Sequence, residues 1–293
     1  MKKILLLFLI CFCAAGTSYA FDWKSLHEEA DKISLEQALA KVGHKPDSSE
    51  ALYVLGLVYL NLHKDQEAQK AFDTMLRSNP GSMYAKWAKA ELMRRRHNLD
   101  EAESALNEVI KETPQFLPAY LTLAYIKFTK TDFEAAAKLT TKVMRQGKAN
   151  IDLSNYVRAM LLFGGAKGMI AHYGGPVSKL INGAVVYPNL QKAQRLQPET
   201  AGVKYGLGAF YLLAPVFAGG DIKKAEQYLI KATQADPLFP DAFVRLAQVY
   251  KLKGDNQKYQ ECIDKALEID PGNELALDIK LGECKFICLD KKG

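Results

Sequence analysis

Five histidines are the residues of this chain best suited to chemistry, because imidazole binds metals and exchanges protons near neutral pH. They are widely separated, and no two share a turn of a helix: His27, His44, His63, His97 and His172. A metal site needs several ligands held together, so this spacing predicts no metal site. His172, beside Tyr173 in a glycine-rich stretch, is the best candidate for a catalytic group. A solvated loop histidine is the alternative interpretation.

The sequence lacks the short motifs that mark common enzyme and cofactor sites. It contains no Walker-type phosphate loop, no G-x-S-x-G, no H-E-x-x-H and no C-x-x-C. Gly206 and Gly208 match part of a dinucleotide-binding motif, but Tyr211 stands where its third glycine belongs. We therefore expect neither an enzyme nor a cofactor.

Three consecutive arginines, Arg94 to Arg96, end a segment with helical periodicity. Cations at this position complement the negative end of a helix dipole. The cluster could equally clamp an acidic group, because arginine holds a carboxylate with two parallel hydrogen bonds. The sequence leaves both interpretations open.

The first 20 residues have the pattern of a secretory signal. Lys2 and Lys3 precede an apolar run, and Ser18-Tyr19-Ala20 has the small-x-small form of a cleavage site. The run, about 12 residues long, is too short to span a bilayer. We expect a mature chain that begins near Phe21, is exported to a periplasm and has no transmembrane segment.

The cysteines bear on both lipidation and disulfides. Cys11 and Cys13 lack the small preceding residue of lipoprotein signals, so we do not expect a lipoprotein. In the mature chain Cys262, Cys284 and Cys288 remain, and an exported protein can keep disulfides. A bridge between Cys284 and Cys288 would strain an intact helix, so we expect Cys262 to pair with one of them. Three buried free thiols are the alternative.

Composition and charge are those of a folded protein with an ordinary surface. The chain has 293 residues, of which 48% are hydrophobic and 25% charged, and a formal net charge of +6. Nucleic-acid binding requires cations clustered on one face, whereas the excess here is mild and spread along the chain. We expect no nucleic-acid partner.

Prolines recur at a fixed spacing of 34 residues, from Pro80 to Pro114 and from Pro237 to Pro271. Between them, amphipathic segments carry small residues at fixed offsets, such as Gly56 and Ala68, where two helices can cross closely. This pattern resembles the tetratricopeptide repeat. The resemblance implies an all-α solenoid of helical hairpins that acts as a binding scaffold for a protein or peptide.

The pattern divides the chain into a repeat array with an interruption. Asp132 and Asp221 are the predicted N-caps of two second helices. The expected parts are a signal peptide (1–20), N-terminal capping helices (21–48), three repeats (49–150), an irregular helical insertion (151–200), two repeats (201–273) and a C-terminal capping helix (274–293).

The insertion is rich in glycine, and its glycine pairs predict where helices stop. We expect helices at about 152–163, 177–186 and 189–197, separated at Gly164-Gly165 and Gly174-Gly175. A second insertion, of about five residues, lies around Pro215 in the following repeat.

In tetratricopeptide arrays the first helix of each hairpin lines a concave groove, so the resemblance also implies a binding surface. Aromatic and arginine side chains are typical of binding hot spots. The residues predicted to contact a partner are Tyr53, Leu57, Tyr84, Trp87, Arg94, Arg95, Leu121, Tyr125, Phe128 and Tyr205.

A different class of function stays open. The stretch from Pro215 to Ala225 is similar to the altered repeat of the T-component proteins associated with TRAP transporters. This similarity implies an accessory protein of a transport system that holds a small apolar ligand. Its cavity would be lined by Leu161, Phe163, Met169, Tyr173 and Phe217.

Overall fold

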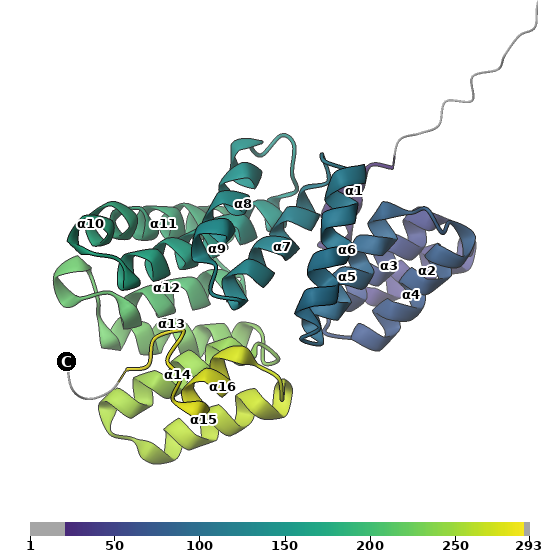
Figure 1. Ribbon diagram of the computed structural model, residues 1–293. Helices are drawn as coiled ribbons and strands as arrows, with labels where there is room; N and C mark the ends of the chain where they lie inside the picture. Colours follow the sequence, from purple (N-terminus) through teal and green to yellow (C-terminus); the bar gives the residue numbers. More distant parts are fainter. Residues whose placement is uncertain (1–20, 290–293) are drawn as a thin grey trace, which may run out of the picture.

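The computed structural model describes residues 21–289, and the regular secondary structure of these residues consists of helices (Figure 1). The predicted signal peptide lies outside the described residues. The helices are α1 (Trp23–Ala30), α2 (Leu35–His44), α3 (Ser49–Asn61), α4 (Asp65–Ser78), α5 (Met83–Arg95), α6 (Leu99–Glu112), α7 (Leu117–Thr129), α8 (Phe133–Arg145), α9 (Leu153–Tyr173), α10 (Pro176–Ala184), α11 (Val186–Leu196), α12 (Ala201–Leu213), the 3₁₀ helix η1 (Val216–Ala218), α13 (Ile222–Ala235), α14 (Pro240–Lys253), α15 (Asn256–Ile269) and α16 (Glu274–Leu281).

Five antiparallel hairpins form the array that the 34-residue period predicts: α3/α4, α5/α6, α7/α8, α12/α13 and α14/α15. Local capping explains where their helices begin. The hydroxyls of Ser48 and Ser82 accept the backbone N–H of the third residue on, in α3 and α5. The predicted caps Asp132 and Asp221 are confirmed at the starts of α8 and α13.

Small residues allow the two helices of a hairpin to approach closely. A Cβ on Gly56 of α3 would overlap the ring of Phe72 of α4, and one on Gly208 of α12 would lie 2.6 Å from Leu229 Cγ of α13. The predicted crossing at Gly56 is therefore confirmed.

The turn between the two helices of a hairpin has a backbone conformation that recurs from one repeat to another. His63, His97 and Thr131, spaced by one 34-residue period, all have positive φ, at 56°, 63° and 63°. Gly254 occupies the same place in the last hairpin. Each of these residues follows the end of a first helix, where a left-handed residue reverses the chain.

The insertion between the third and fourth hairpins differs from the prediction. α9 runs unbroken through Gly164 and Gly165, so the predicted break there is wrong. A Cβ on Gly164 would lie 3.6 Å from Leu190, and one on Gly165 would lie 3.5 Å from Phe128. These are ordinary contact distances, so both positions have room for a methyl group within a continuous helix. The predicted break at Gly174 is confirmed, because α9 ends at Tyr173 and α10 and α11 follow.

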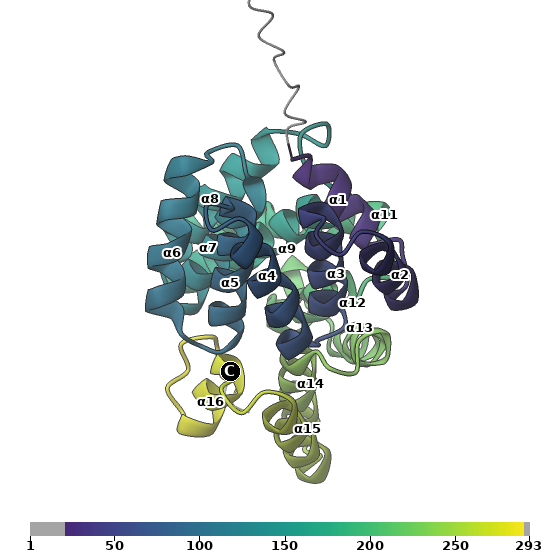
Figure 2. The same ribbon diagram turned by 90° about the vertical axis from the view of Figure 1, so that its right-hand side faces the viewer.

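The array curves until its two ends meet (Figures 1 and 2). His63 Nε2 lies 3.0 Å from Asp236 Oδ2, and His97 lies 2.8 Å from Asp270. The turns of the first two hairpins thus contact the turns that follow α13 and α15. Among residues 21–289, no helix is both long and apolar enough to cross a bilayer.

The C-terminal helix is shorter than predicted. α16 ends at Leu281, and Gly282 follows with a φ of 70°. Residues 283–289 then fold back over the array as an irregular segment, here called the C-terminal loop.

Candidate partner-binding groove

The N-terminal helix α1 lies across the first helices of the first three hairpins and reaches α9. Trp23 packs edge-on against Phe116, with ring centroids 5.4 Å apart, and His27 lies 5.5 Å from Trp87. Lys24 Nζ donates to the Ala149 carbonyl at 3.0 Å. Whereas the sequence suggested a cap at the front end, α1 occupies part of the concave face.

His27 fixes α1 in this position through both ring nitrogens. Asn155 Nδ2 donates to His27 Nδ1 at 3.1 Å, so Nε2 carries the proton that bonds Tyr53 Oη at 3.0 Å. Burial lowers the pKa of His27 to about 3. The imidazole is therefore neutral and serves as a structural link between α1, α3 and α9.

Half of the predicted groove residues lie under or beside α1. Tyr53, Leu57, Trp87 and Leu121 are buried. Tyr84 is half-buried and stacks on Phe21, with centroids 4.2 Å apart. This part of the concave face is covered by the chain itself.

The arginine cluster holds an acid that belongs to the chain. Glu91 is buried and accepts from Arg94 at 2.7 and 3.1 Å, from Arg95 at 3.4 Å and from Thr122 at 2.9 Å. Arg95 also pairs with Asp65 at 2.9 Å. Burial alone would raise the pKa of Glu91, but the arginines outweigh burial and lower it. The spacing of Glu91 to Arg94 and Arg95, three and four residues, could have revealed this network.

The other predicted aromatic residues line the middle of the array. The Arg94 guanidinium lies over the Tyr125 ring, 4.3 Å from its centroid. Tyr205 packs against Phe239, with centroids 5.0 Å apart. Burial and nearby Asp241 raise the pKa of Tyr205 to about 12, so its hydroxyl remains a hydrogen-bond donor at neutral pH. Tyr125 and Tyr205 are half-buried and reachable from solvent.

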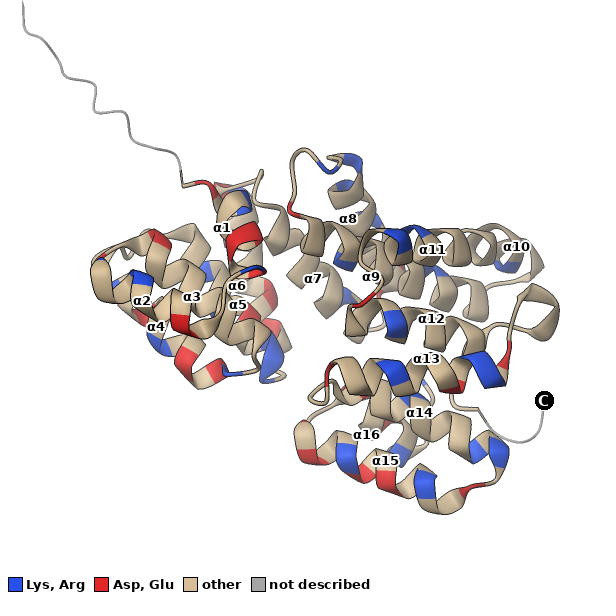
Figure 3. Cartoon of the chain, turned by 180° about the vertical axis from the view of Figure 1, so that it is seen from behind, with Lys and Arg blue, Asp and Glu red and all other residues tan. Residues whose placement is uncertain are grey.

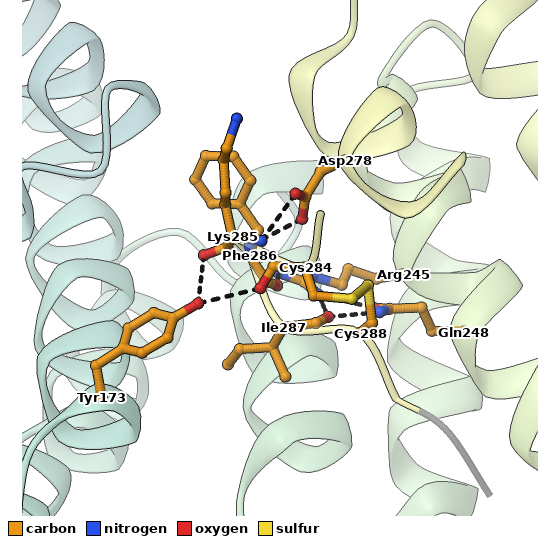
Figure 4. The surroundings of a disulfide bond; sticks show 9 residues. All are labelled: Tyr173, Arg245, Gln248, Asp278, Cys284, Lys285, Phe286, Ile287 and Cys288. Atoms are coloured by element: carbon orange, nitrogen blue, oxygen red, sulfur yellow. Dashed lines mark hydrogen bonds between the residues drawn. A yellow bond between two sulfur atoms is a disulfide. The ribbon is translucent and has the colours of Figure 1, made fainter. Parts of the chain in front are cut away.

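The C-terminal loop covers the other end of the concave face (Figure 4). Arg245 Nη2 donates to the Phe286 carbonyl at 2.9 Å, and Gln248 Nε2 donates to the Ile287 carbonyl at 2.8 Å. The Tyr173 hydroxyl points at the carbonyls of Cys284 and Lys285, at 3.1 and 2.8 Å. The ring of the predicted contact residue Phe128 stacks on Phe286, with centroids 5.8 Å apart.

The predicted disulfide pairing is wrong. Cys284 bonds Cys288 across a Cα–Cα distance of 4.9 Å, and Cys262 is a free thiol. The prediction assumed that both cysteines lie in an intact helix. Because α16 has ended at Leu281, the irregular backbone brings the two cysteines together without helical strain.

Arg158 of α9 is the groove residue that the sequence analysis missed. Its side chain is exposed, and it donates to Asn155 Oδ1 at 3.3 Å. Although solvent reaches this side chain, the protein atoms around it partly desolvate the guanidinium and lower the pKa of Arg158. The charge of Glu91 opposes this shift, and those of Arg94 and Arg95 add to it. Within the described residues no carboxylate forms an ion pair with it, whereas Arg94 and Arg95 each have one. Because α9 lies in the insertion, no repeat position pointed to this arginine.

The residues expected around a small apolar ligand are dispersed. Phe217 is 94% exposed, whereas Met169 is buried. A hollow of about 370 Å³ between α8 and α9 is lined by Met169 and Tyr173 but not by Phe217. His172 is exposed and lies in the last turn of α9 rather than in a loop. These side chains do not enclose a common cavity.

Charged residues are scattered over the helices rather than gathered in one metal-binding group (Figure 3). Within residues 21–289, no three His, Cys, Asp or Glu side chains are grouped so as to hold a metal ion. The open part of the concave face presents the half-buried Tyr125 and Tyr205 beside the guanidinium of Arg158, which forms no ion pair with a carboxylate of residues 21–289.

Comparison of the sequence with known families gives two matches. The N-terminal ARM repeat of tetratricopeptide repeat protein 21 matches residues 13–137. The tetratricopeptide repeat matches residues 240–273, the last hairpin. No curated protein sequence matches the chain.

Solved structures share the fold at low sequence identity. The Cut9–Hcn1 tetramer of the APC/C has a TM-score of 0.55 and 19% identity, over 87% of this chain and 46% of that one. A tetratricopeptide repeat protein from Parabacteroides merdae has a TM-score of 0.52 and 14% identity, over 87% of this chain and 96% of that one. The chain is thus similar to tetratricopeptide repeat proteins in its hairpin solenoid and its last hairpin, and residues 13–137 resemble the N-terminal ARM region of tetratricopeptide repeat protein 21.

Proposed function

We propose that this protein is an exported interaction scaffold that binds a carboxylate-bearing segment of a partner protein in the open middle of its concave face. The segment would lie between α1 and the C-terminal loop. Arg158 is the observation that carries the proposal, because it is an exposed guanidinium in a concave surface and has no carboxylate partner among the described residues.

The surroundings of Arg158 suit such a ligand. Arg94 and Arg95 are balanced by two carboxylates, Glu91 and Asp65, so the third guanidinium, Arg158, gives the cluster a positive excess that attracts an acid. Arginine binds a carboxylate with two parallel hydrogen bonds. Tyr125 and Tyr205 offer rigid, half-buried aromatic surface nearby.

Export is part of the proposal and is supported by the pattern of residues 1–20. The Cys284–Cys288 disulfide fits an oxidising compartment. N-terminal sequencing of the protein isolated from its native cell tests this part. We expect a first residue at or near Phe21; an intact Met1 in the bulk of the protein would contradict export by cleavage.

Photocrosslinking in the native cell tests the binding surface. A photoreactive amino acid at Tyr205 should crosslink a partner protein, whereas the same group at Lys70, exposed on α4, should not. An equal yield at both positions, or none at Tyr205, would contradict binding in the concave face.

A further inference from the structure

α10 turns polar side chains toward the protein and apolar ones away from it. Ser178 Oγ donates to the Ile170 carbonyl of α9 at 3.1 Å, and Asn182 Oδ1 accepts from Lys167 Nζ of α9 at 2.8 Å. The opposite side of α10 carries Val177, Leu180 and Ile181, all exposed. Helices on a protein surface normally have the reverse orientation, so α10 presents an apolar face without a partner.

A second exposed apolar segment lies at the same edge of the molecule. Val216 and Phe217 of η1 are 87% and 94% exposed. Tyr187, at the start of α11, stacks on Phe210 of α12, with ring centroids 4.9 Å apart. A Cβ added to Gly219, the residue that follows η1, would lie 3.6 Å from the Phe210 ring. Figures 1 and 3 both show α10 and the η1 loop on one side of the molecule.

These two segments form a surface that we call the apolar edge. It consists of Val177, Leu180, Ile181, Val216 and Phe217. Exposed large apolar side chains that gather in one place mark a surface with a binding partner.

The charges around the apolar edge are mostly of one sign. Between Asp152 and Glu199 the sequence contains no Asp or Glu but five Lys or Arg, and α10 and α11 show only cations (Figure 3). Lys179 is exposed on α10, and Lys223 is exposed near η1. Asp221, the acid that is nearest to η1 along the chain, forms an ion pair with Lys224 at 3.7 Å. A separate hollow of about 820 Å³ along α8 and α9 is lined by five cations and one acid: Lys127, Lys138, Lys142, Arg145 and Lys167, with Glu134.

We infer that the apolar edge docks on the surface of a lipid bilayer that contains anionic phospholipids. Exposed apolar side chains flanked by lysines are the combination that binds such an interface, because the apolar groups enter the acyl boundary while the cations meet the headgroups. α10 has nine residues and is too short to span a bilayer, so it lies on the surface. The inference does not depend on what occupies the groove.

Brominated lipids test the contact by position. The full chain carrying Phe217→Trp is mixed with vesicles of brominated phosphatidylcholine, with and without phosphatidylglycerol. The matched control is Leu39→Trp, which places the probe at an exposed leucine of α2 away from the apolar edge. The parent chain gives the background fluorescence of Trp23 and Trp87. All variants contain the same residues 1–20, so any effect of that apolar run is common to the variants and the control. We expect quenching at position 217 only, strengthened by phosphatidylglycerol and weakened by salt.

A second pair of variants tests the apolar face of α10. Adding Leu180→Asp to the Phe217→Trp chain should reduce quenching by about tenfold. Adding Leu281→Asp, an equally exposed leucine on α16, should leave it unchanged. In the same Phe217→Trp chain, the two substitutions Lys179→Gln and Lys223→Gln should weaken quenching only on the vesicles that contain phosphatidylglycerol.

Three outcomes would overturn the inference. The first is equal quenching at positions 217 and 39, and the second is quenching that is indifferent to phosphatidylglycerol and salt. The third is an unquenched probe at position 217. If the chain then also forms a dimer in sedimentation equilibrium that Leu180→Asp abolishes, the edge binds a second copy of the chain instead.

Discussion

His97 Nε2 lies 2.8 Å from Asp270 Oδ1, and this contact joins the turn of the second hairpin to the turn after α15. The other ring nitrogen, Nδ1, lies 2.8 Å from Glu274 Oε1. One repeat earlier, His63 meets Asp236 in the same way at 3.0 Å. The two contacts close the curved array and define the walls of the concave face.

This closure should depend on pH. The hydrogen bonds that the His97 imidazolium donates to Asp270 and to Glu274 raise the pKa of His97 to about 10, above the value of about 6.5 in an unfolded chain. Since the folded pKa is the higher one, the stabilisation is complete below about pH 6.5 and is lost as the pH rises through about 10. His97→Gln should cost about 2 kcal/mol at pH 6 and almost nothing above pH 10. Urea unfolding across this range measures the difference.

The control for this prediction is His44→Gln, an exposed histidine at the end of α2. It should leave the pH profile of the parent unchanged. A cost of His97→Gln that stays constant from pH 6 to pH 10 would mean that the histidine acts by packing alone.

Gly56 should not tolerate a side chain. A methyl group there overlaps the fully buried ring of Phe72, so Gly56→Ala should destabilise the fold by about 1–3 kcal/mol. Gly168 in α9 has no atom within 4 Å of its Cβ position, so Gly168→Ala should stabilise by up to about 1 kcal/mol through helix propensity. Thermal unfolding should shift in opposite directions; a shift in the same direction contradicts the crossing geometry.

Tyr53 should hold α1 in place. Tyr53→Phe leaves the buried Nε2–H of His27 without an acceptor, and this should cost about 1–3 kcal/mol. Tyr59→Phe, in the same helix and half-buried, should cost less than about 0.5 kcal/mol. Limited proteolysis near residues 31–34 should become faster in the first variant alone, and equal rates would argue against this role of His27.

The disulfide should stabilise the C-terminal loop modestly, because it closes a short segment. Reduction should lower the free energy of unfolding of the parent by about 2 kcal/mol on the chain-entropy estimate. Reductant should have no effect on the double variant Cys284→Ser, Cys288→Ser. In non-reducing peptide mapping, an alkylated Cys284 together with an oxidised Cys262 would contradict the pairing observed here.

Much of the array could be predicted because its signals are local. The 34-residue period, Gly56 at the crossing and the caps Asp132 and Asp221 act within one hairpin, and all three are found in the structure. The end of α16 could also be predicted from the sequence, because a glycine such as Gly282 typically ends a helix. The predicted capping helix over 274–293 ignores this stop.

The concave face could not be predicted because long-range packing decides what covers it. The contact of His27 with Asn155 joins residues 128 apart, and that of Arg245 with Phe286 joins residues 41 apart. Neither repeat position nor local periodicity marks such a contact. Similarly, α9 packs along its length against α8 and α11, and this tertiary packing favours a continuous helix where the glycines alone predict a break.

The affinity of the partner for Arg158 variants tests the central claim most directly. With the protein captured by crosslinking at Tyr205 in hand, titration calorimetry of the purified pair compares Arg158→Gln with Arg77→Gln, an exposed arginine on α4. Loss of a charge-assisted carboxylate contact should weaken binding by about tenfold or more while helicity stays the same. If Arg158→Gln and Arg77→Gln bind as tightly as the parent, the groove does not recognise its partner through Arg158.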